Sequence, residues 1–156
     1  MQAKKWITLA MAAAMAVSLL AACGGPGSSA GVALDASKIE ALLEAREVDA
    51  AVTADDALSD AVEEAAGVLA ARTFEEVDAM DVKGLVAQKA GVVPLVCEVS
   101  SDAPYWGDSP LQYANRYQER AADLLDSLGD GAYKVAAARF VTQDQVKSVL
   151  FVVTAA

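Results

Sequence analysis

The stretch YKVAAARFVTQDQVKSVLFVV occupies residues 133–153. It contains two apolar runs, Tyr133–Val141 and Val146–Val153, which carry the β-branched and aromatic residues typical of strands. The four polar residues between them, 142–145, suit a tight connection. Because two strands joined by a short loop pair antiparallel, the stretch predicts a β-hairpin. The last strand, Val146–Val153, is predicted to belong to the core.

The first half of the chain predicts helices. Ser37 and Glu40 have the spacing of a capping box, which predicts a helix over Ser37–Glu47. Apolar residues at helical spacing predict a second helix over Asp55–Arg72, with acidic residues in its first turn where the helix dipole favours them. Its other acidic side chains lie mostly off the apolar stripe, so they indicate a solvated face rather than a metal site.

Two shorter helices are expected next. Thr73 and Glu76 form another capping box, which predicts a short helix ending near residue 80. Asp81 is a candidate cap for a helix over Val82–Ala90, and Gly91 is a typical residue to end it.

The remaining elements complete an α+β pattern. Val92–Ser100 reads as a strand, and Pro94 places it at a sheet edge or marks its first residues. Gln112–Leu128 reads as a helix that ends at the turn 129–131. Helices grouped with a small, mainly antiparallel sheet of three strands define an α+β domain.

The N-terminal residues resemble a bacterial lipoprotein signal. Lys4 and Lys5 precede an apolar run, Ile7–Ala22, that suits the central region of an export signal. The run ends in Leu20-Ala21-Ala22-Cys23, which resembles a lipobox. The resemblance implies a cleaved signal over 1–22, acylation of Cys23, and a flexible Gly/Ser-rich tether over 23–34 before one domain, 35–156. A plain export signal or an uncleaved signal-anchor is the alternative.

This resemblance implies a location. The partner would be a lipid bilayer, bound through acylated Cys23. In a cell with one membrane, the domain would face outward from the cytoplasmic membrane. In a cell with two membranes, Gly24 in place of an aspartate implies the outer membrane.

Charge and composition exclude several function classes. Loss of Lys4 and Lys5 with the signal would lower the formal net charge from −10 to −12. Such an acidic chain is repelled by nucleic acid, so we expect no nucleic-acid partner. The chain has no histidine, which removes the commonest general base and metal ligand. We therefore expect no metal site and no cofactor. Cys97 lies in an apolar run and is interpreted as a small buried residue, with a reactive thiol as the alternative.

Aromatic residues gather in the loop after the predicted strand at 92–100 and in the first turns of the helix that follows. Tyr105, Trp106, Tyr113 and Tyr117 lie close together in a chain with few aromatic residues. One interpretation is a binding cleft for a sugar or a peptide, since such rings offer apolar faces with polar groups attached. The other is that they cover the core beneath a long loop.

Several short motifs resemble the CAP/SCP-like extracellular domains. They are Ala41–Arg46, Asp56–Ala61 followed by Ala65-Ala66, Ala90-Gly91 followed by Cys97-Glu98, Trp106–Pro110, and Tyr133–Val153. The resemblance implies an α-β-α sandwich whose cleft would be lined by Glu98 and the aromatic residues. In the family, two histidines and two acidic residues can hold a metal in that cleft.

The chain departs from this family at the metal site. Both histidines are missing, and Gln112 stands at one of their positions in one alignment, whereas an alternative register places 118–125 there. Cys97 replaces a glycine and Val99 an asparagine, so Glu98 alone matches. The resemblance therefore implies a member of the family without the metal-binding set.

Three functions follow from these observations. The first is a membrane-anchored, non-catalytic module that binds an envelope polymer, a peptide or a protein through Glu98, Tyr105, Trp106, Tyr113 and Tyr117. The second is a hydrolase that uses carboxylates, with Glu98 as the acid or base. The third is a structural accessory lipoprotein with a protein partner.

Overall fold

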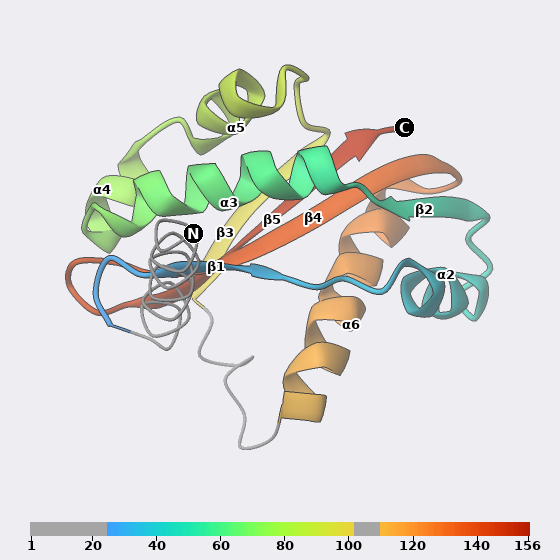
Figure 1. The fold of residues 1–156 in the computed structure, drawn as a ribbon. Helices are drawn as coiled ribbons and strands as arrows, with labels where there is room; N and C mark the ends of the chain where they lie inside the picture. Colours follow the sequence, from blue (N-terminus) through green and yellow to red (C-terminus); the bar gives the residue numbers. More distant parts are fainter. Residues whose placement is uncertain (1–24, 102–109) are drawn as a thin grey trace, which may run out of the picture.

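The chain folds into a sheet of five strands with helices on both faces (Figure 1). The computed structural model describes residues 25–101 and 110–156, and only the backbone of 110–114. The predicted mixture of helix and mainly antiparallel sheet is confirmed. The predicted number of three strands is wrong, because two short strands near the N-terminus join the sheet.

The predicted hairpin forms the centre of the sheet. β4 (Gly131–Val141) pairs antiparallel with β5 (Lys147–Ala155), and Ala137 stands opposite Phe151. β3 (Val96–Ser101) pairs antiparallel with the other side of β5, with Glu98 opposite Phe151. β3 is an edge strand, since β5 is the one strand of the described sheet that pairs with it, but it begins at Val96 rather than at Val92, so Pro94 lies just before the strand.

The other side of β4 is completed by two short strands. β1 (Ser29–Val32) pairs antiparallel with the second half of β4, and β2 (Ala50–Ala54) pairs parallel with the first half. Both must lie on the side of β4 that β5 leaves open. Residues 29–32, which the sequence assigned to a flexible tether, therefore belong to the folded domain.

One face of the sheet carries three helices. α3 (Asp56–Ala70), α4 (Phe74–Ala79) and α5 (Val82–Ala90) bury their apolar residues against Ala136, Ala138, Phe140, Leu150 and Val152. Small residues on both surfaces, such as Ala65, Ala66 and Ala138, are fully buried and allow α3 to lie close to β4. We call this side the α3 face.

The opposite side, the α6 face, carries two helices. α2 (Ala36–Glu44) and α6 (Pro110–Leu128) cover the side chains that alternate with those of the α3 face: Tyr133, Val135, Ala137, Val149, Phe151 and Val153. The alternation follows from the strand geometry, in which successive side chains point to opposite faces.

Most helix ends form as predicted. The Asp55 side chain accepts the Leu58 N–H and caps α3, and Thr73 and Glu76 form the predicted capping box of α4. Asp81 caps α5, which ends at Gly91 in the left-handed conformation, with φ of 71°. In that conformation glycine avoids the steric cost of a side chain.

The predicted cap of α2 is wrong. Asp35, not Ser37, accepts the Lys38 N–H and begins the helix. Glu40 instead accepts a hydrogen bond of 2.8 Å from the Val52 backbone N–H in β2. The carboxylate thus satisfies a donor of a short strand, which explains why the capping-box spacing was misleading.

Candidate functional site

The structure describes some of the predicted site residues and not others. Cys23, Tyr105 and Trp106 lie outside the described residues. Tyr113 lies in α6, where the backbone alone is described. Glu98 and Tyr117 are described in full, and both belong to the α6 face.

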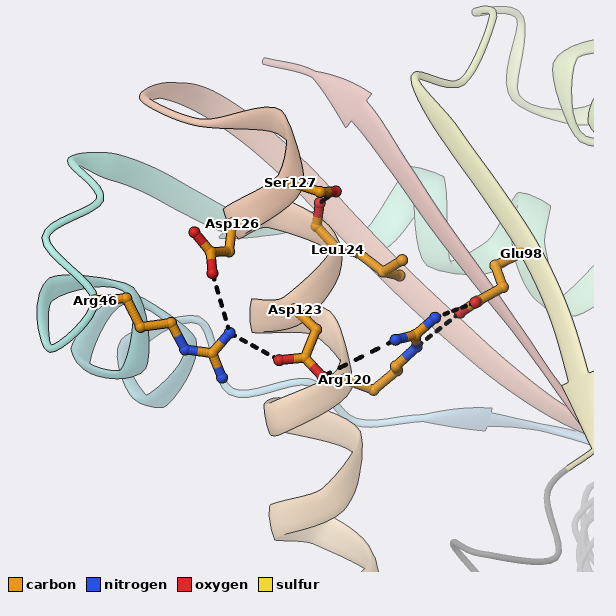
Figure 2. Close-up of polar contacts among 7 residues, drawn as sticks. All are labelled: Arg46, Glu98, Arg120, Asp123, Leu124, Asp126 and Ser127. Atoms are coloured by element: carbon orange, nitrogen blue, oxygen red, sulfur yellow. Dashed lines mark hydrogen bonds and ion pairs between the residues drawn. The ribbon is translucent and has the colours of Figure 1, made fainter.

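Glu98 is held by an ion pair with α6. Arg120 donates from Nε to Glu98 Oε2 at 2.9 Å and from Nη2 to Oε1, so both carboxylate oxygens are engaged (Figure 2). The side chains of Arg120 and Glu98 are 33% and 26% exposed. A two-pronged bond from Arg fixes the orientation of a carboxylate as well as its charge. Here it joins the edge strand β3 to the middle of α6.

This pair continues into a chain of charges along α6. Asp123 lies 3.9 Å from Arg120 and accepts a 2.7 Å hydrogen bond from Arg46, which also lies 3.6 Å from Asp126 (Figure 2). The bond to Asp123 and the charges of both aspartates raise the pKa of Arg46 above its ordinary value. The network therefore joins the turn after α2, α6 and β3.

Tyr117 is part of the core. Its side chain is 3% exposed, and its ring centroid lies 6.1 Å from that of Phe151 at an angle of 48°. A ring packed in this way stabilises the α6 face and offers no surface for a ligand. At this position the structure agrees with the interpretation that an aromatic residue covers the core.

A buried amide lies one residue further along α6. Gln118 is 4% exposed, accepts the Asp35 N–H at 2.9 Å and donates to the Ala33 carbonyl at 3.3 Å. It satisfies two backbone groups of the segment between β1 and α2. A buried amide is costly to leave without partners, so these two bonds satisfy Gln118 and hold that segment against α6.

Described residues line several surface depressions, and three of them bear on the argument. The largest of these three, about 420 Å³, is acidic and is lined by Glu40, Glu44, Glu47, Val48, Asp49 and Ala50. A groove of about 310 Å³ lies between α2 and α6, beside Leu42 and Gln118. A third, of about 320 Å³, lies between β3 and the α4–α5 segment.

Cys97 lines this third groove and is half-buried. Burial raises the pKa of its thiol to about 11. Since the thiolate is the reactive form, the thiol is poorly reactive at neutral pH. The interpretation of Cys97 as a small packing residue agrees with this environment.

The described residues were also compared with the requirements of a metal site and of a membrane-spanning helix. Within 25–101 and 110–156, the side chains form no group of three or more potential ligands suited to a metal ion. Among the helices of the same ranges, none combines the length and apolar character needed to cross a bilayer.

Comparisons with known proteins give no relative. The chain matches no protein-family model, no curated protein and no solved structure.

Sequence reasoning identified Glu98 but missed its partner. Arg120 lies 22 residues further along the chain, and neither residue carries a local signal that points to the other. Arg46 and Gln118 were missed for the same reason. The polar side of α6, where Arg120 and Asp123 are three residues apart, was the one available hint.

Proposed function

We propose that this protein is a lipid-anchored, extracytoplasmic lipoprotein whose domain acts as a non-catalytic interaction module at the cell envelope. The observation that carries the proposal is the Leu20-Ala21-Ala22-Cys23 motif, preceded by two lysines and an apolar run. Acyl chains on Cys23 would contribute about 0.8 kcal/mol per buried CH₂ group, so two or three chains give a stable anchor.

The environment of Glu98 supports an interaction role over hydrolysis. A general acid or base must exchange a proton with a substrate within hydrogen-bond distance. Both oxygens of Glu98 are instead bonded to Arg120, and the pair joins two elements of the fold. Tyr105, Trp106 and Tyr113 stay predicted contacts for an envelope ligand.

Membership of the CAP/SCP-like family also stays a prediction. Helices on both faces of a mainly antiparallel sheet are in keeping with it. The prediction of three strands did not include the parallel strand β2, nor a sheet of five strands.

Acylation is tested with the two cysteines as a matched pair. The full chain is expressed in a bacterium with an alkyne-labelled fatty acid, and the mature N-terminus is analysed by mass spectrometry. We expect label on Cys23, loss of label and of membrane association in Cys23→Ser, and unchanged label in Cys97→Ser. An unlabelled wild-type chain that keeps residues 1–22 would contradict the proposal.

Binding is tested with the anchored chain and purified envelope fragments. We expect saturable binding that disappears in a Trp106→Ala, Tyr113→Ala variant and persists in Glu119→Gln, an exposed change on α6. Binding that survives the double change would remove the aromatic residues from the proposed site. Specific recovery of one stoichiometric protein would instead favour an accessory lipoprotein with a protein partner.

A further inference from the structure

The chain joins the folded domain almost immediately after the proposed anchor. Ser28 donates from its backbone N–H to the Gly25 carbonyl at 3.2 Å, which closes a turn over 25–28. Gly27 N–H donates to the Val141 carbonyl at 2.8 Å, and Val141 N–H donates to the Ser28 carbonyl at 2.9 Å. From Gly27 onward the chain is therefore bonded to the end of β4, and Gly25 is joined to it through the turn.

Several other segments meet at this same end of the sheet. In the turn between β4 and β5, Gln143 donates to the carbonyls of Ala70 and Arg72, at the end of α3. In the same turn, Asp144 accepts the Phe74 N–H at the start of α4. We call residues 25–28, 70–75 and 142–147 the hairpin end; it lies at the left of Figure 1.

The length of the connection decides how far this end can lie from the membrane. Gly25 follows Cys23 by two residue steps. At about 3.3–3.6 Å per residue, they span at most about 7 Å. An acylated Cys23 would thus hold the hairpin end within one or two water layers of the lipid headgroups.

The opposite end of the sheet is acidic. Asp49 lies beside the start of β4, where its N–H is accepted by the Asp130 side chain and its carbonyl accepts the Gly131 N–H. We call residues 40–50 and 129–131 the acidic end; it contains the cleft lined by Glu40, Glu44, Glu47 and Asp49. β4, with 11 residues, separates the two ends by about 33 Å, given a rise of about 3.3 Å per residue.

The two ends of the sheet also differ in net charge. At the hairpin end, Arg72 and Lys147 balance Glu75 and Asp144. At the acidic end five acidic residues outnumber a single basic residue, Arg46. An anionic membrane surface repels the second end and not the first, and the repulsion fades over a Debye length of about 8 Å.

From this geometry we propose that the anchor seats the domain directly on the bilayer, with the hairpin end against the headgroups and the acidic cleft facing away. The inference rests on the proposed acylation of Cys23. It replaces a flexible tether by a fixed orientation, and it presents the acidic cleft as the surface that a partner in the surrounding compartment meets first.

The orientation is tested with fluorescent probes at the two ends of the lipidated full chain. The background is Cys97→Ser, so that the introduced cysteine carries the one free thiol after acylation. Gln145→Cys and Glu47→Cys form a matched pair, because both residues are exposed and both have positive φ, 66° and 60°. The chains are reconstituted into phosphatidylcholine vesicles with or without nitroxide-labelled headgroups.

We expect nitroxide lipids to remove most of the fluorescence of the Gln145→Cys probe and to leave the Glu47→Cys probe unchanged. Equal quenching at both positions, or none at either, would overturn the orientation. Glu75→Cys and Glu44→Cys, also exposed and from the same two ends, serve if either turn variant does not fold.

A second experiment lengthens the connection between the acylation site and the folded domain. An insert of 12 Gly/Ser residues between Gly24 and Gly25 adds a mean span of about 20 Å, so the difference between the two probes should disappear. A difference that survives the insert would contradict the role of the short connection. A wild-type chain that does not float with vesicles would refute the proposed anchor itself, whereas floating chains with equal quenching refute the orientation alone.

Discussion

The main helices of the two faces are held by different kinds of contact. On the α3 face, α3 and α4 begin at caps that bond to residues three positions away, Asp55 to Leu58 and Thr73 to Glu76. On the α6 face, α2 has a cap of the same kind at Asp35, but α6 makes contacts with residues far away in sequence, such as Gln118 to Asp35 and Arg120 to Glu98.

The comparison distinguishes contacts that the local sequence specifies from contacts that form only in the complete fold. A cap forms wherever its own helix forms, since both partners belong to the same turn. A contact such as Arg120 to Glu98 requires the sheet and α6 to be in place first. The centres of both faces, in contrast, are apolar and fully buried.

The largest expected effect concerns those centres and is the same on both faces. Phe140 on the α3 face and Phe151 on the α6 face are each 1% exposed. Phe140→Ala and Phe151→Ala should each lower the free energy of unfolding by about 3–5 kcal/mol. Urea denaturation of residues 25–156 measures both, and a cost below about 1 kcal/mol on one face would show that its core is not packed as described.

A smaller effect should distinguish the two faces. Gln118→Ala removes two hydrogen bonds from a side chain that is 4% exposed, which should cost about 1–3 kcal/mol at about 0.5–1.5 kcal/mol for each bond. Gln143→Ala removes a single side-chain bond, which an exposed residue of the hairpin turn donates to the Ala70 carbonyl. Its cost should be about half that of Gln118→Ala, because one bond is lost instead of two. Equal costs in urea denaturation would contradict the role given to Gln118.

The coupling energies of ion pairs on the two faces should differ by a smaller amount. A double-mutant cycle on Glu98→Gln and Arg120→Gln should give a coupling of about 0.2–1 kcal/mol that falls in 1 M salt. The comparison on the α3 face is Lys89 with Glu64, 3.6 Å apart, where Glu64 is 65% exposed. Its coupling should be smaller. A larger coupling for the Lys89 pair, or no salt dependence for Arg120, would argue against a built contact at Glu98.

The smallest effect is a dependence on pH at the α3 face. The Leu58 N–H and Lys134 lower the pKa of Asp55 below its ordinary value of 3.8. The unfolded chain then binds protons before the folded one does, so the stabilisation is complete above about pH 4 and is lost as the pH falls. Asp55→Asn, which retains a capping group, should lose less stability than wild type between pH 5 and 3. Parallel losses in urea titrations would contradict this assignment.

The sequence predictions succeeded where contacts are local and failed where they join residues far apart in sequence. α3, α5 and the central hairpin carry periodic apolar residues with caps or turns at their ends, and each forms close to its predicted bounds. β1 and β2, with the sequences SAGV and AAVTA, are poor in strand-forming residues. They are strands because the open side of β4 offers backbone partners, which no local pattern reports.

The candidate site was less accessible from sequence than the fold. Glu98 was singled out by resemblance, but its bonds to Arg120 depend on a contact between β3 and α6. Tyr117 was grouped with its aromatic neighbours, although its position on the apolar side of α6 places it against Phe151. Proximity in sequence did not show that this ring belongs to the core.

The central claim is that the chain becomes part of the folded domain two residues after the proposed acylation site. Hydrogen exchange of the anchored full chain tests it most directly, at the amides of Gly27 and Val141. Both donate to backbone carbonyls across the start of β1, so both should exchange far more slowly than an unstructured peptide. Protection of Val141 with free exchange at Gly27 would restore a flexible tether and contradict the account.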